Sequence, residues 1–275
     1  MLSWVLLTVL GVSAGVVGAA STSKGSGTPQ GEPYMGVYIG KLSTLEHQVT
    51  GHVYAVDNTT IYIKGFTYDG EAPDAFFFAG NRTPEPTSRG FIIPDERNRK
   101  QVLGPYRNRN LVLNFPITKK GQRSLSDVQW VSVWCRQFAI DFGHVKIPRD
   151  MVKPAPQIGE GLLSDKPRLR SSAVTVVDTN TIQLDDFTFD ATVPDAIFVM
   201  GSGDAEASGS QVPDEKGTKE PLSKYNQRSI QLSIPREVRG EPIQYFGVWS
   251  PTKGMLASVT FEPNALLPPA ISSLP

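Results

Sequence analysis

The feature that most constrains this chain is an internal repeat, because a chain that carries the same motifs twice in the same order folds as two copies of one unit. The segment Val56 to Ile61 returns as Val177 to Ile182, so Asp57 corresponds to Asp178 at an offset of 121 residues. Further matching pairs follow in the same order: Gly40–Ser43 with Gly161–Ser164, Phe66–Asp69 with Phe187–Asp190, Pro73–Phe77 with Pro194–Phe198, Pro94–Glu96 with Pro213–Glu215, and Val133–Cys135 with Val248–Ser250. The offset falls from 121 to 119 and then to 115, which indicates that loops shortened while the strands kept their order.

Each copy shows the short-strand pattern of an all-β fold. Residues 51–56 and 60–63 flank Asp57 and Asn58, a turn-favouring pair, and therefore predict a hairpin. Further strands are predicted at 74–79, 110–115, 128–135 and 139–145. No segment keeps a helical period for three turns, and 25 glycines and 22 prolines interrupt the chain too often for a helical bundle. The sequence predicts two tandem small antiparallel β-sandwich or β-barrel domains.

The start of the chain predicts export. Residues 2–20 carry no charged side chain and end in the small residues Gly18, Ala19 and Ala20, which is typical of a signal peptide cleaved near Ala20. A membrane anchor is the alternative, but glycines interrupt the segment and its length is the bare minimum for a span of about 20 residues. We therefore expect a secreted, extracellular protein with no membrane span in the mature chain.

Composition divides the rest of the chain into domains, a linker and tails. Ser, Gly and Pro dominate both ends and predict disorder, while prolines between the copies predict a semi-rigid linker. The predicted organisation is a signal peptide at 1–20, a disordered tail at 21–35, a first domain at 36–148, a Pro-rich linker at 149–156, a second domain at 157–263 and a disordered tail at 264–275.

Charge and cysteine content limit the possible partners. The chain has 27 basic and 27 acidic side chains, so we expect no nucleic-acid partner. Cys135 is the only cysteine, so no internal disulfide can form and the packed core must provide the stability of what we expect to be a monomer. The sequons at Asn58 and Asn81 predict glycosylation if the chain is exported.

The combined order of motifs resembles the DM-thirteen domain, and it does so in both copies. The resemblance is carried by Gly40, Leu42, Val56, Asp57, Ile61, Phe66, Tyr68, Asp69, Pro73, Asp74, Ala75, Phe77 and Val133–Cys135. A tandem of such domains after a signal peptide is similar to the N-terminal part of the Knickkopf and Skeletor type of arthropod proteins. The resemblance implies a non-catalytic extracellular-matrix module that organises and protects cuticular chitin, with chitin or cuticular matrix proteins as partners.

In that family a DOMON domain typically follows the tandem. The sequence ends at Pro275 without one, so we expect a short isoform, a truncated paralogue or a fragment of a longer gene product. A plain protein-interaction domain of such a truncated form is a further alternative to a matrix module.

Cys135 is the one candidate for redox chemistry, because the resemblance implies a redox or electron-transfer role for the cysteine at this position. Strand alternation places it on the same face as Val131 and Val133, which favours a buried and inert thiol. Its counterpart Ser250 is followed by Pro251, which predicts a strand end where the side chain is partly exposed. Both interpretations stay open.

Two groups of side chains are candidates for ligand binding. Trp130 and Trp134 share one face of a predicted strand and could stack on a sugar ring, although most such aromatics pack under loops. Arg97, Arg99 and Lys100 belong to residues 82–109, where seven basic and three acidic side chains give a net charge of +4.

The matching segment of the second copy, residues 203–228, has four basic and five acidic side chains and a net charge of −1. We therefore expect the first copy to carry any contact with acidic matrix components.

Other polar residues predict structure rather than chemistry. Asp69, Asp74 and Asp95 recur in the second copy, but each lies beside a proline or at a strand end, where aspartate closes turns. The histidines at 47, 52 and 144 align with Arg168, Ala173 and Val259, so we expect no metal and no cofactor. Without a recognisable hydrolase, P-loop or dinucleotide motif, we expect a non-enzyme, or a redox protein rather than a hydrolase if it is active.

Overall fold

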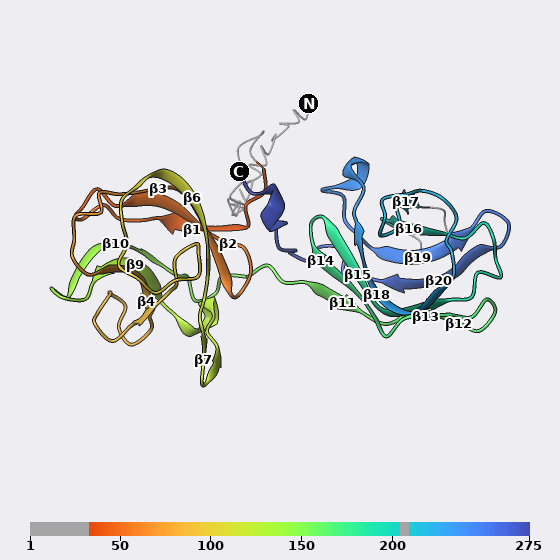
Figure 1. Ribbon diagram of the computed structural model, residues 1–275, viewed down its shortest axis with the longest axis horizontal. Helices are drawn as coiled ribbons and strands as arrows, with labels where there is room; N and C mark the ends of the chain where they lie inside the picture. The colour runs from red at the N-terminus through yellow and green to blue at the C-terminus, as the bar shows by residue number, and fades with distance from the viewer. Residues whose placement is uncertain (1–32, 204–208) are drawn as a thin grey trace, which may run out of the picture. The chain divides into compact units, whose positions relative to one another are not determined.

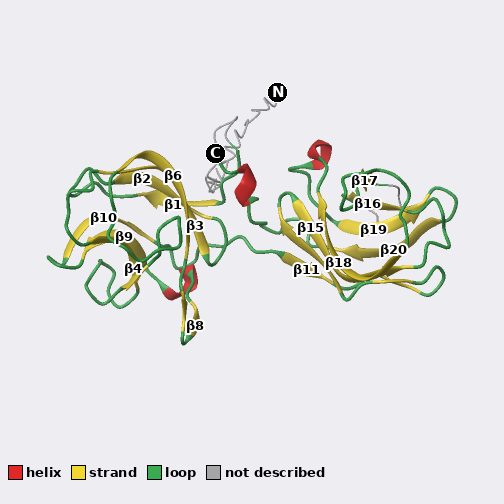
Figure 2. Cartoon of the chain, viewed as in Figure 1, coloured by secondary structure: helices red, strands yellow, loops and turns green. Residues whose placement is uncertain are grey.

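The computed structural model describes residues 33–203 and 209–275. The predicted signal peptide and most of the predicted N-terminal tail lie outside the described residues. Strands β1 to β10 form a first module and strands β11 to β20 form a second (Figure 1). Strands and loops account for nearly all of the described chain, and the helices are short 3-10 turns (Figure 2).

The first module is a sandwich of two antiparallel sheets, which Figure 1 shows as two layers. One sheet has the order β1 (Val37–Lys41), β2 (Thr50–Ala55), β3 (Thr60–Tyr68) and β6 (Tyr106–Asn114). The other has the order β10 (Ile140–Lys146), β9 (Trp130–Cys135), β4 (Ala75–Gly80) and β5 (Phe91–Ile92). A small hairpin of β7 (Ile117–Thr118) and β8 (Gly121–Gln122) and the 3-10 helix η1 (Leu125–Asp127) connect the two sheets in sequence.

The core of the first module lies between these sheets. Phe66 from β3 and Phe77 from β4 are buried, with ring centroids 5.1 Å apart. Alternation along β4 sends Phe76 and Phe78 to the opposite face, yet these are also almost fully buried. The second sheet is therefore covered on both faces.

The predicted hairpin is confirmed, with bounds that differ slightly from the sequence prediction. Strands β2 and β3 pair so that Ala55 lies opposite Ile61. The Asp57 carboxylate accepts hydrogen bonds from the backbone nitrogen of Thr59 at 2.6 Å and from its hydroxyl at 2.9 Å, which closes the turn.

The second module repeats this sandwich with its own core. Its first sheet has the order β11 (Gln157–Gly159), β14 (Ala173–Asp178), β15 (Thr181–Phe189), β13 (Leu169–Arg170) and β12 (Leu163–Ser164), with β18 (Tyr225–Ser233) also paired to β15. Its second sheet has the order β17 (Ser210–Val212), β16 (Ile197–Gly201), β19 (Tyr245–Ser250) and β20 (Gly254–Thr260). Phe187 and Phe198 are fully buried with ring centroids 5.4 Å apart, as Phe66 and Phe77 are in the first module. The all-β, tandem-sandwich prediction is confirmed.

Residues after β20 have defined contacts although their composition predicts disorder. The 3-10 helix η2 (Arg236–Val238) lies between β18 and β19, and the 3-10 helix η3 (Ile271–Ser273) follows β20. Thr179 donates its backbone N–H to the carbonyl of Pro268 at 3.0 Å, and its hydroxyl accepts the N–H of Ala270 at 3.2 Å. Ala270 is 2% exposed. These contacts hold the segment against the turn between β14 and β15.

Candidate functional site

Cys135 is the last residue of β9, and the structure buries it completely. Its exposed fraction is 0%, and it belongs to the same core cluster as Val131 and Val133. The interpretation that a strand end would expose this thiol is therefore wrong. Strand β9 pairs on both sides at this position, with Ala75 of β4 and Ile140 of β10, so its end still lies inside the sheet.

The positive charge next to Cys135 is directed elsewhere. Arg136 holds Asp74 at 3.1 Å and lies over the ring of Phe76, 4.4 Å from its centroid. Successive side chains of a strand point to opposite faces, so Arg136 and Cys135 point away from each other. The Arg136 guanidinium therefore meets Asp74 on the outer face and not the thiol in the core. Arg136 is thus engaged with Asp74 and Phe76 and is not paired with the Cys135 thiol.

The corresponding residue of the second module, Ser250, is also 0% exposed but is fully hydrogen-bonded. Its hydroxyl donates to Asp195 at 2.7 Å and accepts the backbone N–H groups of Thr252 at 3.2 Å and Lys253 at 3.1 Å. Hydrogen bonds from Ser250 and Thr252 lower the pKa of Asp195. The serine thus closes a turn, whereas Cys135 fills apolar space.

Both candidate sugar-stacking residues are buried under a loop. Trp130 is 1% exposed and Trp134 is 4% exposed. The ring of Phe78 stacks between them, with centroid distances of 6.3 Å to Trp130 and 6.2 Å to Trp134. The covering loop, residues 81–90, packs against Trp130 and Phe78, and the indole N–H of Trp130 donates to the carbonyl of Thr83 at 3.1 Å. Neither tryptophan ring is accessible to a ligand in this structure.

Of the basic candidates Arg97, Arg99 and Lys100, only Arg99 binds a buried carboxylate with its side chain. Asp95 is 5% exposed and accepts the backbone N–H of Arg97 at 3.0 Å and of Arg99 at 2.7 Å. The Arg99 guanidinium also binds this carboxylate, at 2.9 Å. Arg97 and Lys100 are exposed, and the Arg97 Nε lies 3.9 Å from Glu96. Of the three, Arg97 and Lys100 are the two whose side chains do not bind Asp95.

A tyrosine–glutamate pair recurs in both modules and was not predicted from the sequence. Tyr106 donates its hydroxyl to Glu96 at 2.9 Å, and Tyr225 donates to Glu215 at 2.7 Å. Burial and the glutamate raise the pKa of both phenols. Both members are related by the same offset of 119 residues, so a closer comparison of the copies would have found the pair.

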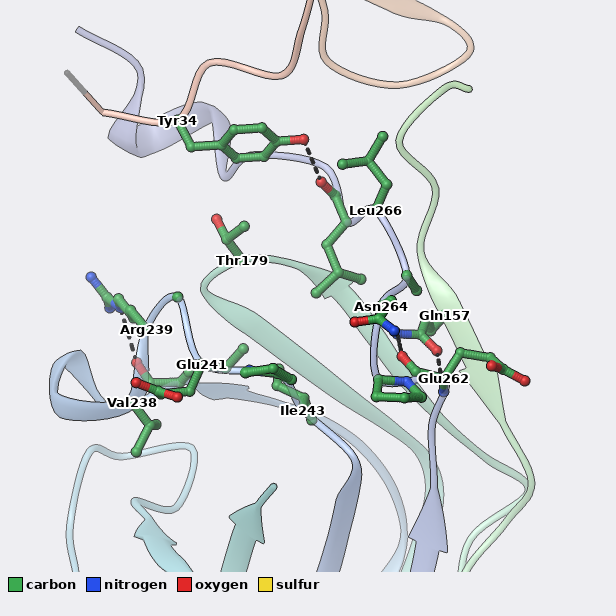
Figure 3. A pocket seen from close by; sticks show the side chains of 16 residues that line it. Tyr34, Gln157, Thr179, Val238, Arg239, Glu241, Ile243, Glu262, Asn264 and Leu266 are labelled. Atoms are coloured by element: carbon green, nitrogen blue, oxygen red, sulfur yellow. Dashed lines mark hydrogen bonds between the residues drawn. The ribbon is translucent and has the colours of Figure 1, made fainter. Parts of the chain in front are cut away.

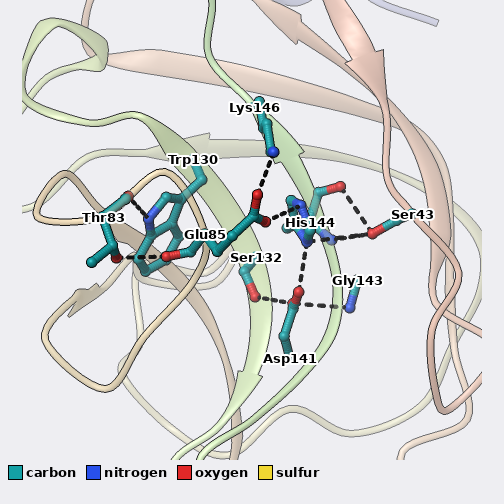
Figure 4. A network of polar contacts seen from close by, with 9 residues as sticks. All are labelled: Ser43, Thr83, Glu85, Trp130, Ser132, Asp141, Gly143, His144 and Lys146. Atoms are coloured by element: carbon teal, nitrogen blue, oxygen red, sulfur yellow. Dashed lines mark hydrogen bonds and ion pairs between the residues drawn. The ribbon is translucent and has the colours of Figure 1, made fainter.

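The most extensive polar network lies on the outer face of β9 and β10 (Figure 4). Asp141 accepts hydrogen bonds from the Ser132 hydroxyl at 2.6 Å, the backbone N–H of Gly143 at 3.1 Å and His144 Nδ1 at 2.6 Å. On the other side of the ring, His144 Nε2 lies 3.4 Å from Glu85, which also binds Lys146. The network therefore ties the covering loop to β10.

The ring of His144 lies between two carboxylates. Asp141 is 2.6 Å from Nδ1, and Glu85 is 3.4 Å from Nε2. Ser43 also lies on the Nδ1 side, 3.5 Å from that nitrogen. The Ser43 hydroxyl is bonded to the backbone of His144, because it donates to the carbonyl at 3.2 Å and accepts the N–H at 2.9 Å. A triad needs the serine hydroxyl to donate to the ring, so the network is not a nucleophilic triad.

Close backbone packing supports this network. A Cβ on Gly143 would lie 2.1 Å from the carbonyl oxygen of Ser43, so only glycine fits there. The second module lacks the histidine. Strand pairing makes Ser258 the counterpart of His144, because each lies one residue before the valine paired to Val131 or Phe246. The sequence alignment with Val259 is thus wrong by one residue, since a loop of different length precedes the strand.

A pocket of about 310 Å³ is lined mainly by two segments of the second module, residues 234–243 after β18 and residues 262–267 after β20 (Figure 3). Several of its polar side chains form hydrogen bonds to the protein backbone. Gln157 exchanges two hydrogen bonds with the backbone of Glu262, at 3.1 and 2.9 Å, and Arg239 donates to the carbonyl of Ile234 at 3.2 Å. Tyr34 donates to Leu267 at 3.1 Å, and burial raises its pKa to about 12. The pocket brings together no acid–base pair.

The recurring aspartates close turns, as their sequence positions predict. Asp69 accepts the N–H of Glu71 at 3.0 Å, and Asp190 accepts the N–H of Thr192 at 3.1 Å. Within residues 33–203 and 209–275, no group of three or more His, Cys, Asp or Glu side chains is placed to hold a metal ion. No helix in the same part of the chain is long and apolar enough to cross a membrane.

These features define a tandem β-sandwich protein without a recognisable catalytic centre in its described residues. The chain belongs to the DM13 family, because the family described as electron transfer DM13 matches residues 41–147 and 163–255, well over half of its length. The family resemblance found in the sequence is confirmed.

Two relatives come from Drosophila melanogaster. Protein Skeletor, isoforms B/C, is 41% identical over 220 residues, which cover 79% of this chain and 27% of that protein. Protein Skeletor, isoforms D/E, has the same identity over 79% of this chain and 14% of its own length. The chain thus corresponds to a small part of each relative. No solved structure matches it.

Proposed function

We propose that this chain is a secreted, non-catalytic extracellular-matrix module that binds chitin or the proteins associated with it. The observation that carries this proposal is the burial of Cys135, because the single cysteine of the chain lies in the core and is replaced by serine in the second module. The proposal also rests on the similarity to the Skeletor proteins and on the uncharged, apolar residues 2–20.

The test is retention of the full chain on chitin beads, with cellulose beads as a matched polysaccharide that lacks acetamido groups. Chitin is uncharged, so we expect retention on chitin to persist in high salt and retention on cellulose to be weak. Retention of cuticular proteins by the immobilised chain tests the protein-binding alternative. A chain that retains neither chitin nor cuticular proteins would contradict the proposal.

A redox function at Cys135 is the second candidate, favoured by the description of the family as an electron-transfer domain. It requires the thiolate to reach an oxidant such as hydrogen peroxide, which would convert it to a sulfenic acid and release hydroxide that solvent protonates to water. Labelling of the folded chain with a maleimide, with and without peroxide, distinguishes the two candidates. Rapid labelling that peroxide blocks would favour the redox function, and a thiol silent until unfolding would favour the matrix module.

A further inference from the structure

A groove of about 420 Å³ lies at the end of the first module, where β10 leads into the linker. Its volume falls within the range of about 300–1,000 Å³ that is usual for small-molecule sites. Leu125, Val128 and Ile147 contribute apolar side chains, all of them buried. Arg149 and Lys153 contribute polar ones from the start of the linker.

Both sequons of the chain lie beside this groove, although they are 23 residues apart in sequence. Asn81 lines the groove directly, and its backbone carbonyl accepts a hydrogen bond from Gln129 at 2.9 Å. The Asn58 side chain is exposed, and its oxygen accepts the N–H of Ser126 at 3.2 Å and the hydroxyl of Ser126 at 2.9 Å. Ser126 also lines the groove.

We propose that Asn81 carries an N-linked glycan whose first N-acetylglucosamine residues occupy this groove and hold the start of the linker, residues 148–153, against the first module. This inference rests on the export that the proposed function requires. An N-acetylglucosamine ring has an apolar face for the floor at Val128 and Ile147, and it has hydroxyl and acetamido groups for Gln129 and Arg149.

The two sequons are not equivalent in this geometry. Asn81 itself lines the groove and is exposed, so a sugar on its amide nitrogen starts at the groove. Asn58 reaches the groove only through Ser126, and a glycan there keeps the amide oxygen as an acceptor for Ser126. We therefore expect the Asn58 glycan to extend into solvent, which makes Asn58 a matched control.

The experiment uses the full chain secreted from an insect cell behind a leader from another secreted protein, so that both sequons enter the secretory pathway whatever residues 1–20 do. Wild type, Asn81→Gln and Asn58→Gln are compared by glycopeptide mass spectrometry and by limited trypsin digestion. Arg149 is exposed and followed by Asp150, so trypsin can cut there, while Pro154 protects the bond after Lys153.

We expect glycans at both sites, and cleavage after Arg149 about tenfold slower in wild type and Asn58→Gln than in Asn81→Gln, since proteolysis follows the accessible population. Removal of the wild-type glycans by a glycosidase should abolish the protection. Near-UV circular dichroism confirms that Asn81→Gln keeps the packing around Trp130.

An unoccupied Asn81, or equal cleavage after Arg149 in wild type and Asn81→Gln, would overturn the inference. A parallel sample with the chain's own residues 1–20 separates the two proposals. If that sample stays inside the cell while the groove protects Arg149 in the other, the extracellular proposal fails, and with it the glycan on the native chain, while the fit of the glycan to the groove stands.

Discussion

The two modules share one backbone plan but use it with different chemistry at equivalent positions. Cys135 fills an apolar site at the end of β9, while Ser250 at the end of β19 is bonded to Asp195 and two backbone groups. In the first module the equivalent aspartate, Asp74, binds Arg136 instead. The comparison shows that a buried side chain is needed at this strand end. An apolar thiol occupies it in one module, and a hydrogen-bonded hydroxyl occupies it in the other.

The outer face of the second sheet differs more. The first module ties its covering loop to β10 through Glu85, His144 and Lys146. The second module has Ser258 in place of the histidine. Features that close turns or fill the core are therefore shared, and the polar network is specific to the first module.

The strongest way to break the comparison is to truncate a core phenylalanine in one module at a time. Phe66→Ala and Phe187→Ala each remove a fully buried ring, which should cost about 3–5 kcal/mol of unfolding free energy. If the cores are independent, each variant lowers only one of two transitions in differential scanning calorimetry. A single transition that both variants lower equally would show that the modules unfold together.

The next largest loss of stability is expected at the matching turns Pro94–Glu96 and Pro213–Glu215. Asp95→Asn removes charged hydrogen bonds from a carboxylate that is 5% exposed, which should cost about 1.5–3 kcal/mol. Asp214→Asn should cost less, because its partners are exposed and include no arginine. Urea denaturation of both variants measures the difference, and an equal loss would mean that Arg99 adds nothing.

These turns also predict acid sensitivity. Burial acts to raise the pKa of Asp95, but hydrogen bonds from Arg99 and Arg97 outweigh it and lower the pKa. A lowered pKa in the folded state stabilises the protein above the ordinary carboxyl pKa of about 4, and this stability is lost as the pH falls through the folded value. The wild type should lose stability below about pH 4, and Asp95→Asn should lose less of it.

Exchanging the residues at the strand ends sharpens the comparison. Cys135→Ser places a hydroxyl in an apolar site, which should lower the unfolding free energy by about 1–3 kcal/mol. The loss would be smaller if Asp74 gave up its ion pair with Arg136 and accepted a hydrogen bond from the new hydroxyl. Ser250→Cys should lower the melting temperature of the second module by weakening the bonds to Asp195 and Thr252. Melting curves of the two variants test this. If Cys135→Ser left the melting temperature unchanged, a hydrogen-bonded serine would be accommodated at this position in both modules.

The smallest expected effect concerns surface charge. Arg97 and Lys100 are exposed in the first module, so Arg97→Gln with Lys100→Gln should weaken retention of the full chain on an acidic polysaccharide at low salt. The double replacement of Lys216 and Lys219 by Gln is the control in the second module. Equal effects of the two double variants, or retention that salt does not weaken, would contradict a binding surface specific to the first module.

The sequence alone was enough to predict the repeat, most of the longer strands and several turns, because these depend on local patterns. Alternating apolar residues predict β2, β3 and β9, and Asp57 and Asp95 predict turns through bonds to their own neighbouring backbone. The tyrosine–glutamate pair was also within reach, since its members recur at one offset.

Only the tertiary structure decided which side chains are accessible. Whether Trp130 faces solvent depends on the covering loop, and whether Cys135 is exposed depends on two neighbouring strands that pair with β9 from other parts of the chain. The network at His144 likewise joins residues up to 101 positions apart. Burial is a property of the assembled sandwich, because it is set by long-range contacts that no local pattern in the sequence encodes.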